Sequence, residues 1–191
     1  MWERLMSAWG KGPACQLEMA LRYTRAFPKD FVGWIALADA LGGIARYPEA
    51  QAALRKAEKT ATPEHWWEIA LQWGHLCRKY DEKAAERWYR KAIALSPNAS
   101  THIFLGATLI QQGRFAEAKR HCLRAIRLAS DPAEDNLDEA FCNLGLILRA
   151  ERKYMKALDC FRKALKLSPK YVTAREALQD VQRAMRLRKS G

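Results

Sequence analysis

Residues 141–169 read FCNLGLILRAERKYMKALDCFRKALKLSP, and this stretch decides the fold. Its first half carries apolar residues three or four positions apart, at Phe141, Leu144 and Leu148. That spacing is typical of one apolar stripe along an α-helix. Its second half is built in the same way around Ala157 and ends at Pro169. The stretch predicts two helices that pack closely, because Gly145 and Ala157 keep side-chain bulk out of their contact.

The same two-part pattern occurs four times along the chain. Its second half is an alanine, a larger residue four positions later and an alanine seven positions later, as in Ala50/Leu54/Ala57, Ala85/Tyr89/Ala92, Ala118/Cys122/Ala125 and Ala157/Phe161/Ala164. Its first half lies about a dozen residues upstream, around Leu37-Ala38, Trp73-Gly74, Leu105-Gly106 and Leu144-Gly145. Successive first alanines are 35, 33 and 39 residues apart, and we place the longer step in 130–136. Such a period predicts an array of helix pairs.

This pattern resembles the tetratricopeptide repeat (TPR) family, whose motif is W-x2-L-G-x2-Y, then A-x3-F, then P, on two antiparallel helices. The resemblance implies an all-α, TPR-type solenoid of antiparallel helix hairpins. Its four repeats are expected at about 31–63, 66–98, 99–131 and 138–170. A degenerate N-terminal hairpin is expected over 1–30 and a C-terminal capping helix over 171–188, all within one solenoid domain.

Composition predicts a globular, basic protein. The 191 residues are 49% hydrophobic and 10% aromatic, which excludes a disordered chain. The formal net charge is +12, and 13 basic residues against 4 acidic ones fall in 149–191. A basic patch is expected at the very end, at Arg183, Arg186, Arg188 and Lys189. Such an end favours an acidic partner.

The cysteines and the N-terminal sequence predict a reducing compartment. The five cysteines form no C-x-x-C pair and lie in apolar, alanine-rich segments, which disfavours disulfides and zinc sites. The first residues lack the apolar stretch of a signal peptide, and no run reaches the ~20 apolar residues of a membrane helix. We expect a cytoplasmic protein with no membrane span.

Catalytic and cofactor motifs are not found in the sequence. It contains neither the phosphate-binding loop G-x-x-x-x-G-K-[ST] nor the dinucleotide fingerprint G-x-G-x-x-G. The four histidines show no H-x-x-x-H spacing, and His121 and Cys122, being adjacent on a helix, point about 100° apart. We therefore predict a non-catalytic protein with no metal and no cofactor.

The resemblance also implies where a partner would bind. In the TPR family the first helices of successive hairpins line a concave groove that usually takes a peptide or a helix. Projecting each first helix places the following residues in that groove: Val32, Ile35, Asp39, Leu71, Gln72, His75, Ile103, Phe104, Ala107, Ile110, Cys142, Asn143, Leu146 and Arg149. Most are apolar, and only Asn143 resembles a residue of the clamp by which chaperone-tail binders hold a carboxylate. We expect an adaptor that binds an apolar peptide or helix.

Two alternatives stay open at this point. The basic C-terminal region could bind an acidic protein or nucleic acid, and of these the nucleic acid is less favoured, because single-stranded binders stack bases on exposed aromatics. That region has only Tyr154, Phe161 and Tyr171. The chain could also self-assemble into a homo-oligomer, in which its own surfaces or termini fill the groove.

Overall fold

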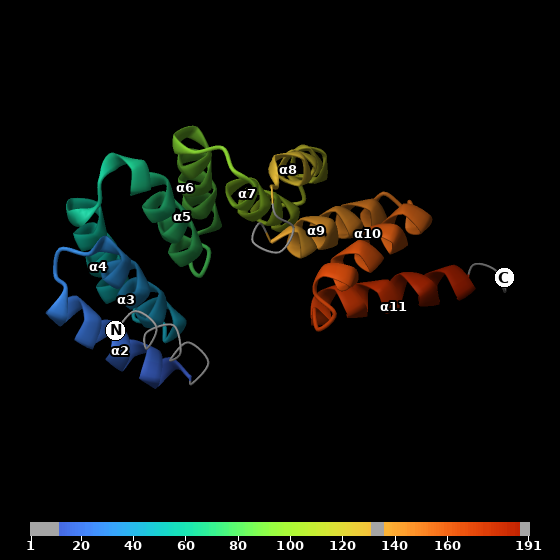
Figure 1. The fold of residues 1–191 in the computed structure, drawn as a ribbon. Coiled ribbons are helices and arrows are strands. Elements are labelled where there is room, and N and C mark those ends of the chain that lie inside the picture. The colour runs from blue at the N-terminus through green and yellow to red at the C-terminus, as the bar shows by residue number, and fades with distance from the viewer. Residues whose placement is uncertain (1–11, 131–135, 188–191) are drawn as a thin grey trace. The chain divides into compact units, whose positions relative to one another are not determined.

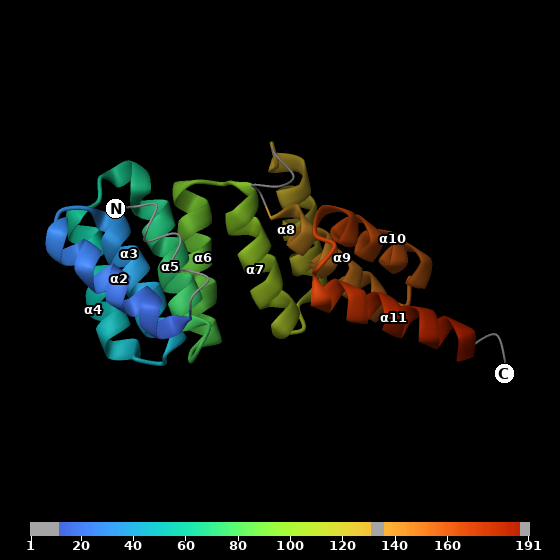
Figure 2. The same ribbon diagram turned by 60° about the horizontal axis from the view of Figure 1, so that its bottom comes forward.

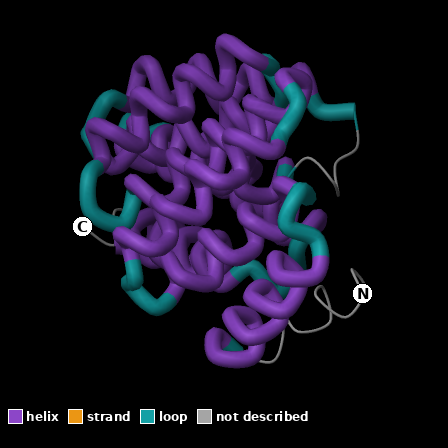
Figure 3. Tube along the Cα trace, turned by 90° about the vertical axis from the view of Figure 1, so that its left-hand side faces the viewer, coloured by secondary structure: helices purple, strands orange, loops and turns teal. Residues whose placement is uncertain are grey.

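The computed structural model describes residues 12–130 and 136–187, and its helices are drawn in Figure 1. Within these ranges the secondary structure consists of ten α-helices and one short 3-10 helix, without a strand (Figure 3). The predicted all-α fold is confirmed. The chain divides into two compact units, 1–95 and 96–191, each treated by itself below. The repeat boundaries and the single-domain organisation given above stay predictions.

The first unit is a series of antiparallel helices (Figure 1). Its elements are α2 (Pro13–Ala26), α3 (Phe31–Gly43), α4 (Tyr47–Thr60), the 3-10 helix η1 (Pro63–His65), α5 (Trp66–Cys77) and α6 (Glu82–Leu95). Helices α3 and α4 form one hairpin and α5 and α6 a second, while α2 packs on α3 and α4 packs on α5. The first helix of the degenerate hairpin predicted over 1–30 lies outside the described residues.

The second unit repeats this arrangement (Figure 2). Its elements are α7 (Ala99–Gln111), α8 (Phe115–Leu128), α9 (Leu137–Ala150), α10 (Tyr154–Leu167) and α11 (Val172–Leu187). Helices α7 and α8 form one hairpin and α9 and α10 the next, and α8 packs on α9. Helix α11 packs on α10 and α9 through its buried Ala174, Ala177 and Val181.

Short polar and glycine-containing segments set the helix ends. Asp30 begins α3, where its Oδ1 accepts a hydrogen bond from the Val32 N–H at 3.0 Å. Asn98 begins α7 with a capping box, in which its Oδ1 accepts from the Thr101 N–H and its own N–H donates to Thr101 Oγ1. Gly113 lies between α7 and α8 with φ at +72°, a conformation that costs glycine little. These ends keep each hairpin connection short.

The core of each hairpin is a small residue on the first helix facing a larger one on the second. The alanines that mark the second helices, Ala50, Ala85, Ala118 and Ala157, are fully buried. A Cβ added at Gly74 would lie 2.3 Å from the Tyr89 ring, and one added at Gly145 would lie 2.5 Å from the Phe161 ring. Glycine at these positions lets the two helices approach until an aromatic ring fills the contact.

Candidate functional site

In the first unit, the predicted groove residues lie on α3 and α5, which pack against each other. Val32 and Ile35 are half-buried on α3, and Asp39 keeps solvent access. On α5, Gln72 and His75 are half-buried. These two helices carry a face that combines apolar side chains with an acid, an amide and an imidazole.

The charged groups of this face are shifted from their usual pKa values. Loss of water around the Asp39 carboxyl raises its pKa, and the nearby Lys79 acts in the opposite direction. Burial lowers the pKa of His75 to about 4, and the positive charges of Arg78 and Lys79 add to the shift. His75 is therefore a neutral imidazole at physiological pH, while Asp39 supplies the negative charge of this face.

In the second unit, the predicted groove residues lie on α7 and α9, which also pack against each other. Phe104, Ala107 and Ile110 recur every three residues on α7 and are half-buried. Leu146 and Arg149 are half-buried on α9. Arg149 Nη1 lies 3.8 Å from Asp180 Oδ2 on α11, a long ion pair between two solvent-accessible side chains. This face is mainly apolar.

Four of the fourteen residues are buried, and the prediction that they line an open groove is wrong. Ile103 and Cys142 are 0% and 1% exposed, Asn143 is 7% exposed and Leu71 is 8% exposed. Ile103 belongs to a core cluster with Ala125 of α8 and Leu137 and Ala140 of α9. The physical reason is that, within each unit, the two first helices pack on each other as well as on their own partners, α3 on α5 and α7 on α9. Two contacts bury more of each first helix than a single hairpin predicts.

The buried cysteine and asparagine of α9 differ in their partners. Cys142 shares a hydrogen bond with Tyr171, and burial raises the pKa of the Cys142 thiol to about 11, so it is an unreactive core residue. The Asn143 Nδ2 is buried with no hydrogen-bond partner in the described part of the chain.

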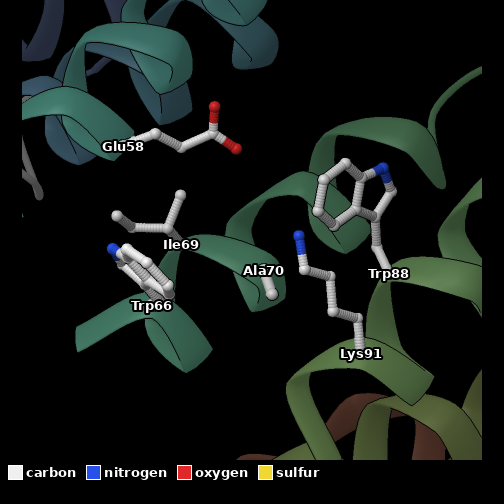
Figure 4. Close-up of a pocket in the computed structure, with 6 residues that line it drawn as sticks. All are labelled: Glu58, Trp66, Ile69, Ala70, Trp88 and Lys91. Carbon is white, nitrogen blue, oxygen red and sulfur yellow. The ribbon is translucent and has the colours of Figure 1, made fainter. Parts of the chain in front are cut away.

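Sequence reasoning missed a pocket of about 220 Å³ in the first unit (Figure 4). It is lined by Glu58 of α4, by Trp66, Ile69 and Ala70 of α5, and by Trp88 and Lys91 of α6. Glu58 Oε1 accepts a hydrogen bond from Trp73 Nε1 at 2.9 Å, and the Trp73 and Trp88 rings stack with centroids 5.3 Å apart. The sequence shows the tryptophans, but no pattern in it predicts that the Glu58 side chain contacts them.

Sequence reasoning also missed a histidine pair in the second unit. His102 of α7 and His121 of α8 lie with their Nδ1 atoms 2.9 Å apart, so one nitrogen donates a hydrogen bond and the other accepts it. Burial lowers the pKa of His102 to about 4, and the neighbouring His121 and Arg124 add to this. Across the described ranges, no group of three or more histidine, cysteine or acidic side chains could hold a metal ion.

Acidification is expected to destabilise the chain through His75 and His102. Both have a pKa near 4 when folded and near 6.5 when unfolded, so the unfolded chain binds more protons between these values. Stability that is present above the unfolded pKa is therefore lost as the pH falls toward 4, by at most ~1.4 kcal/mol per pH unit for each histidine. Urea unfolding at several pH values measures this slope. His75→Gln and His102→Gln should each flatten it, and a slope unchanged in both variants would contradict the assignment.

The predicted basic patch lies partly outside the described residues. Arg183 and Arg186 are exposed on α11, and Arg188 and Lys189 lie beyond the described range. A search of the helices within 12–130 and 136–187 for one long and apolar enough to cross a membrane finds none.

The comparisons with known proteins identify the repeat. Two family models, both described as tetratricopeptide repeat, match the chain. One matches residues 99–132 and the other residues 138–171. Human DnaJ homolog subfamily C member 7 is 32% identical over 112 residues, which are 58% of this chain and 22% of that protein. The mouse cell division cycle protein 16 homolog is 26% identical over 152 residues, which are 76% of this chain and 24% of that protein. The chain thus spans less than a quarter of the length of either relative.

A solved structure shares the fold. The PilF protein of Pseudomonas aeruginosa superposes with a TM-score of 0.71 at 25% identity, over 82% of this chain and 69% of that one. The sequence motif, the helix hairpins and the matched family models agree. The chain is a tetratricopeptide repeat protein, and its repeats are of the kind that serve as a scaffold for protein–protein interaction.

Proposed function

We propose that this protein is a non-catalytic adaptor that binds a partner peptide or helix on the partly exposed faces of its first helices. The observation that carries the proposal is the apolar row of the second unit, made of Phe104, Ala107 and Ile110 on α7 and Leu146 on α9. All four side chains keep partial solvent access, although they are apolar or small. Partly exposed apolar side chains on neighbouring helices are what an amphipathic helix or an extended apolar peptide recognises.

Polar groups on the first helices of each unit would orient the bound segment. In the second unit the Arg149 guanidinium, 3.8 Å from Asp180, can donate hydrogen bonds to an acidic group of the partner. In the first unit Asp39 offers a negative charge and Gln72 a neutral amide. Buried Leu71, Ile103, Cys142 and Asn143 are left out of the proposed contact surface and act through packing.

Glutamates in the apolar row are expected to abolish partner binding without unfolding the chain. The variant is Ile110→Glu with Leu146→Glu, which introduces two charges at positions that are only half-buried. A bound apolar segment would have to desolvate both, so we expect at least a ~10-fold loss of affinity. The measurement is affinity capture from native lysate at low and high salt, then titration of the purified partner.

The matched control is Met155→Glu, which adds a charge on α10 at a side chain that is 59% exposed and lies outside the row. It should leave capture unchanged. Full capture by the double variant would contradict the proposal. Capture that is lost at high salt and depends on Arg183 and Arg186 would instead favour the basic C-terminal region as the binding surface.

A further inference from the structure

The pocket between α4, α5 and α6 uses a different face of α5 from the predicted groove residue His75. Trp66, Ile69 and Ala70 follow the spacing of one helical face. His75 is nine residues from Trp66, which turns it by about half a circle around the helix. A guest in this pocket would therefore not occupy the place of a segment bound beside His75.

Aromatic rings of this protein already hold cations. Lys56 Nζ lies 4.4 Å from the Trp34 ring centroid, Lys91 Nζ lies 4.6 Å from the Trp88 centroid and Lys163 Nζ lies 5.4 Å from the Phe141 centroid. An indole face attracts a cation through its quadrupole. Trp66 is 46% exposed, and no lysine or arginine of the described residues lies over its ring.

The pocket also carries a carboxylate without a counter-ion. Glu58 makes one hydrogen bond, from Trp73 Nε1, and within the described residues no basic group lies within 4.0 Å of its oxygens. Figure 4 shows Glu58 and Trp66 on either side of Ile69 along one wall of the pocket, with Trp88 and Lys91 on the opposite wall. The hydrogen bond to Trp73 fixes one oxygen of Glu58 and leaves the other available.

A second pocket, one repeat earlier, shows the arrangement with its charges satisfied. It is lined by residues of α2, α3 and α4, among them Trp34, Arg46, Glu49 and Lys56. There Arg46 pairs with Glu49 at 2.5 Å, and Lys56 covers the Trp34 ring. The pocket between α4, α5 and α6 differs in two ways. Within the described residues, no cation lies over its Trp66 ring and no ion pair involves its Glu58 carboxylate.

We propose that this pocket, which we call the tryptophan pocket (Glu58, Trp66, Ile69, Ala70, Trp88 and Lys91), binds an arginine side chain of a partner protein. The guanidinium stacks on Trp66 and pairs with Glu58, and the aliphatic part of the side chain contacts Ile69 and Ala70. A volume of about 220 Å³ suits one long side chain and is smaller than the ~300 Å³ or more of a typical small-molecule site. The Glu58 carboxylate and the Trp66 ring favour a basic group, and Lys91 opposes it.

Lys91 makes the proposal sharply testable, because it and Glu58 have opposite effects on a cationic guest. Lys91 repels such a guest from across the pocket, so Lys91→Gln should tighten binding about twofold. Glu58→Gln removes the attracting charge but keeps an oxygen that accepts from Trp73, so it should weaken binding about fivefold with the fold unchanged. A guest of acidic chemistry would reverse both signs.

The experiment uses the full chain labelled with ¹⁵N and a blocked pentapeptide, Gly-Gly-Arg-Gly-Gly, as the probe. The indole N–H signals of Trp66, Trp73 and Trp88 report on the pocket, and a retained Trp73 signal in Glu58→Gln reports that the fold is kept. We expect saturable shifts with the arginine peptide and none with the same peptide carrying citrulline, which is neutral and of equal shape. Trp66→Ala should abolish the shifts, and Ile110→Glu should not alter them, which separates this site from the proposed function.

Equal shifts with citrulline, tighter binding in Glu58→Gln, or tighter binding of a glutamate peptide would each overturn the proposal. Unchanged arginine binding in Trp66→Ala would do so as well.

Discussion

Ile103→Glu is expected to destabilise the second unit strongly. Ile103 is completely buried against Ala125 of α8 and against Leu137 and Ala140 of α9. A glutamate there must either bury an unpaired charge or force α7 away from α8 and α9, and either event costs roughly 3–5 kcal/mol. A domain is stable by only about 5–15 kcal/mol, so this loss is a large part of the total. Urea unfolding followed by circular dichroism measures it.

The matched control is Ile110→Glu on the same helix. Ile110 lies seven residues after Ile103 and is half-buried. The carboxylate of a glutamate at position 110 can therefore stay hydrated. The expected cost of this change is within about 1 kcal/mol. If the two variants were equally stable, the packing of α7 on α9 described above would be contradicted. If Ile110→Glu alone unfolded the chain, the apolar row would be core rather than binding surface.

The difference between Ile103 and Ile110 also shows how far the sequence could predict the candidate site. Helical spacing and the small residues Gly74, Gly106 and Gly145 predicted an all-α fold of helix hairpins, because these features are local. Burial by the neighbouring first helix is not local: Ile103 meets Leu137 and Ala140 across 34 or more residues. A projection that considers one hairpin at a time therefore counts such residues as exposed.

The tryptophan pocket was beyond sequence reasoning for a related reason. The spacing of Trp66, Ile69 and Ala70 indicates one helical face, but an amphipathic helix gives the same spacing. What distinguishes the pocket is that Glu58 accepts a hydrogen bond from Trp73, fifteen residues away, and forms no ion pair within the described residues. The sequence offers lysines and arginines close to Glu58 on α4, such as Arg55 and Lys59. Only the side-chain geometry says which charges are paired.

Gly74→Ala and Gly145→Ala are expected to destabilise the chain by about 1–3 kcal/mol each, and Gly106→Ala by less. The added methyl would lie 2.3 Å from the Tyr89 ring at the first position and 2.5 Å from the Phe161 ring at the second. Both rings are fully buried and cannot move aside without shifting a helix. At Gly106 the nearest atom is Cys122 Sγ at 3.2 Å, a contact that a small adjustment can relieve.

The control for these three variants is Gly43→Ala at the end of α3. A Cβ there meets no atom within 4 Å, so the change keeps only the helix-propensity gain of up to ~1 kcal/mol and should stabilise the chain. Urea midpoints of the four variants should therefore rank Gly43→Ala, Gly106→Ala, then the other two. A double-mutant cycle of Gly145→Ala with Phe161→Leu should give a coupling energy of about 1 kcal/mol or more, because the ring that clashes has been removed. No coupling would mean that the hairpin has room for the methyl, and the close approach of α9 and α10 would then not be what selects glycine at this position.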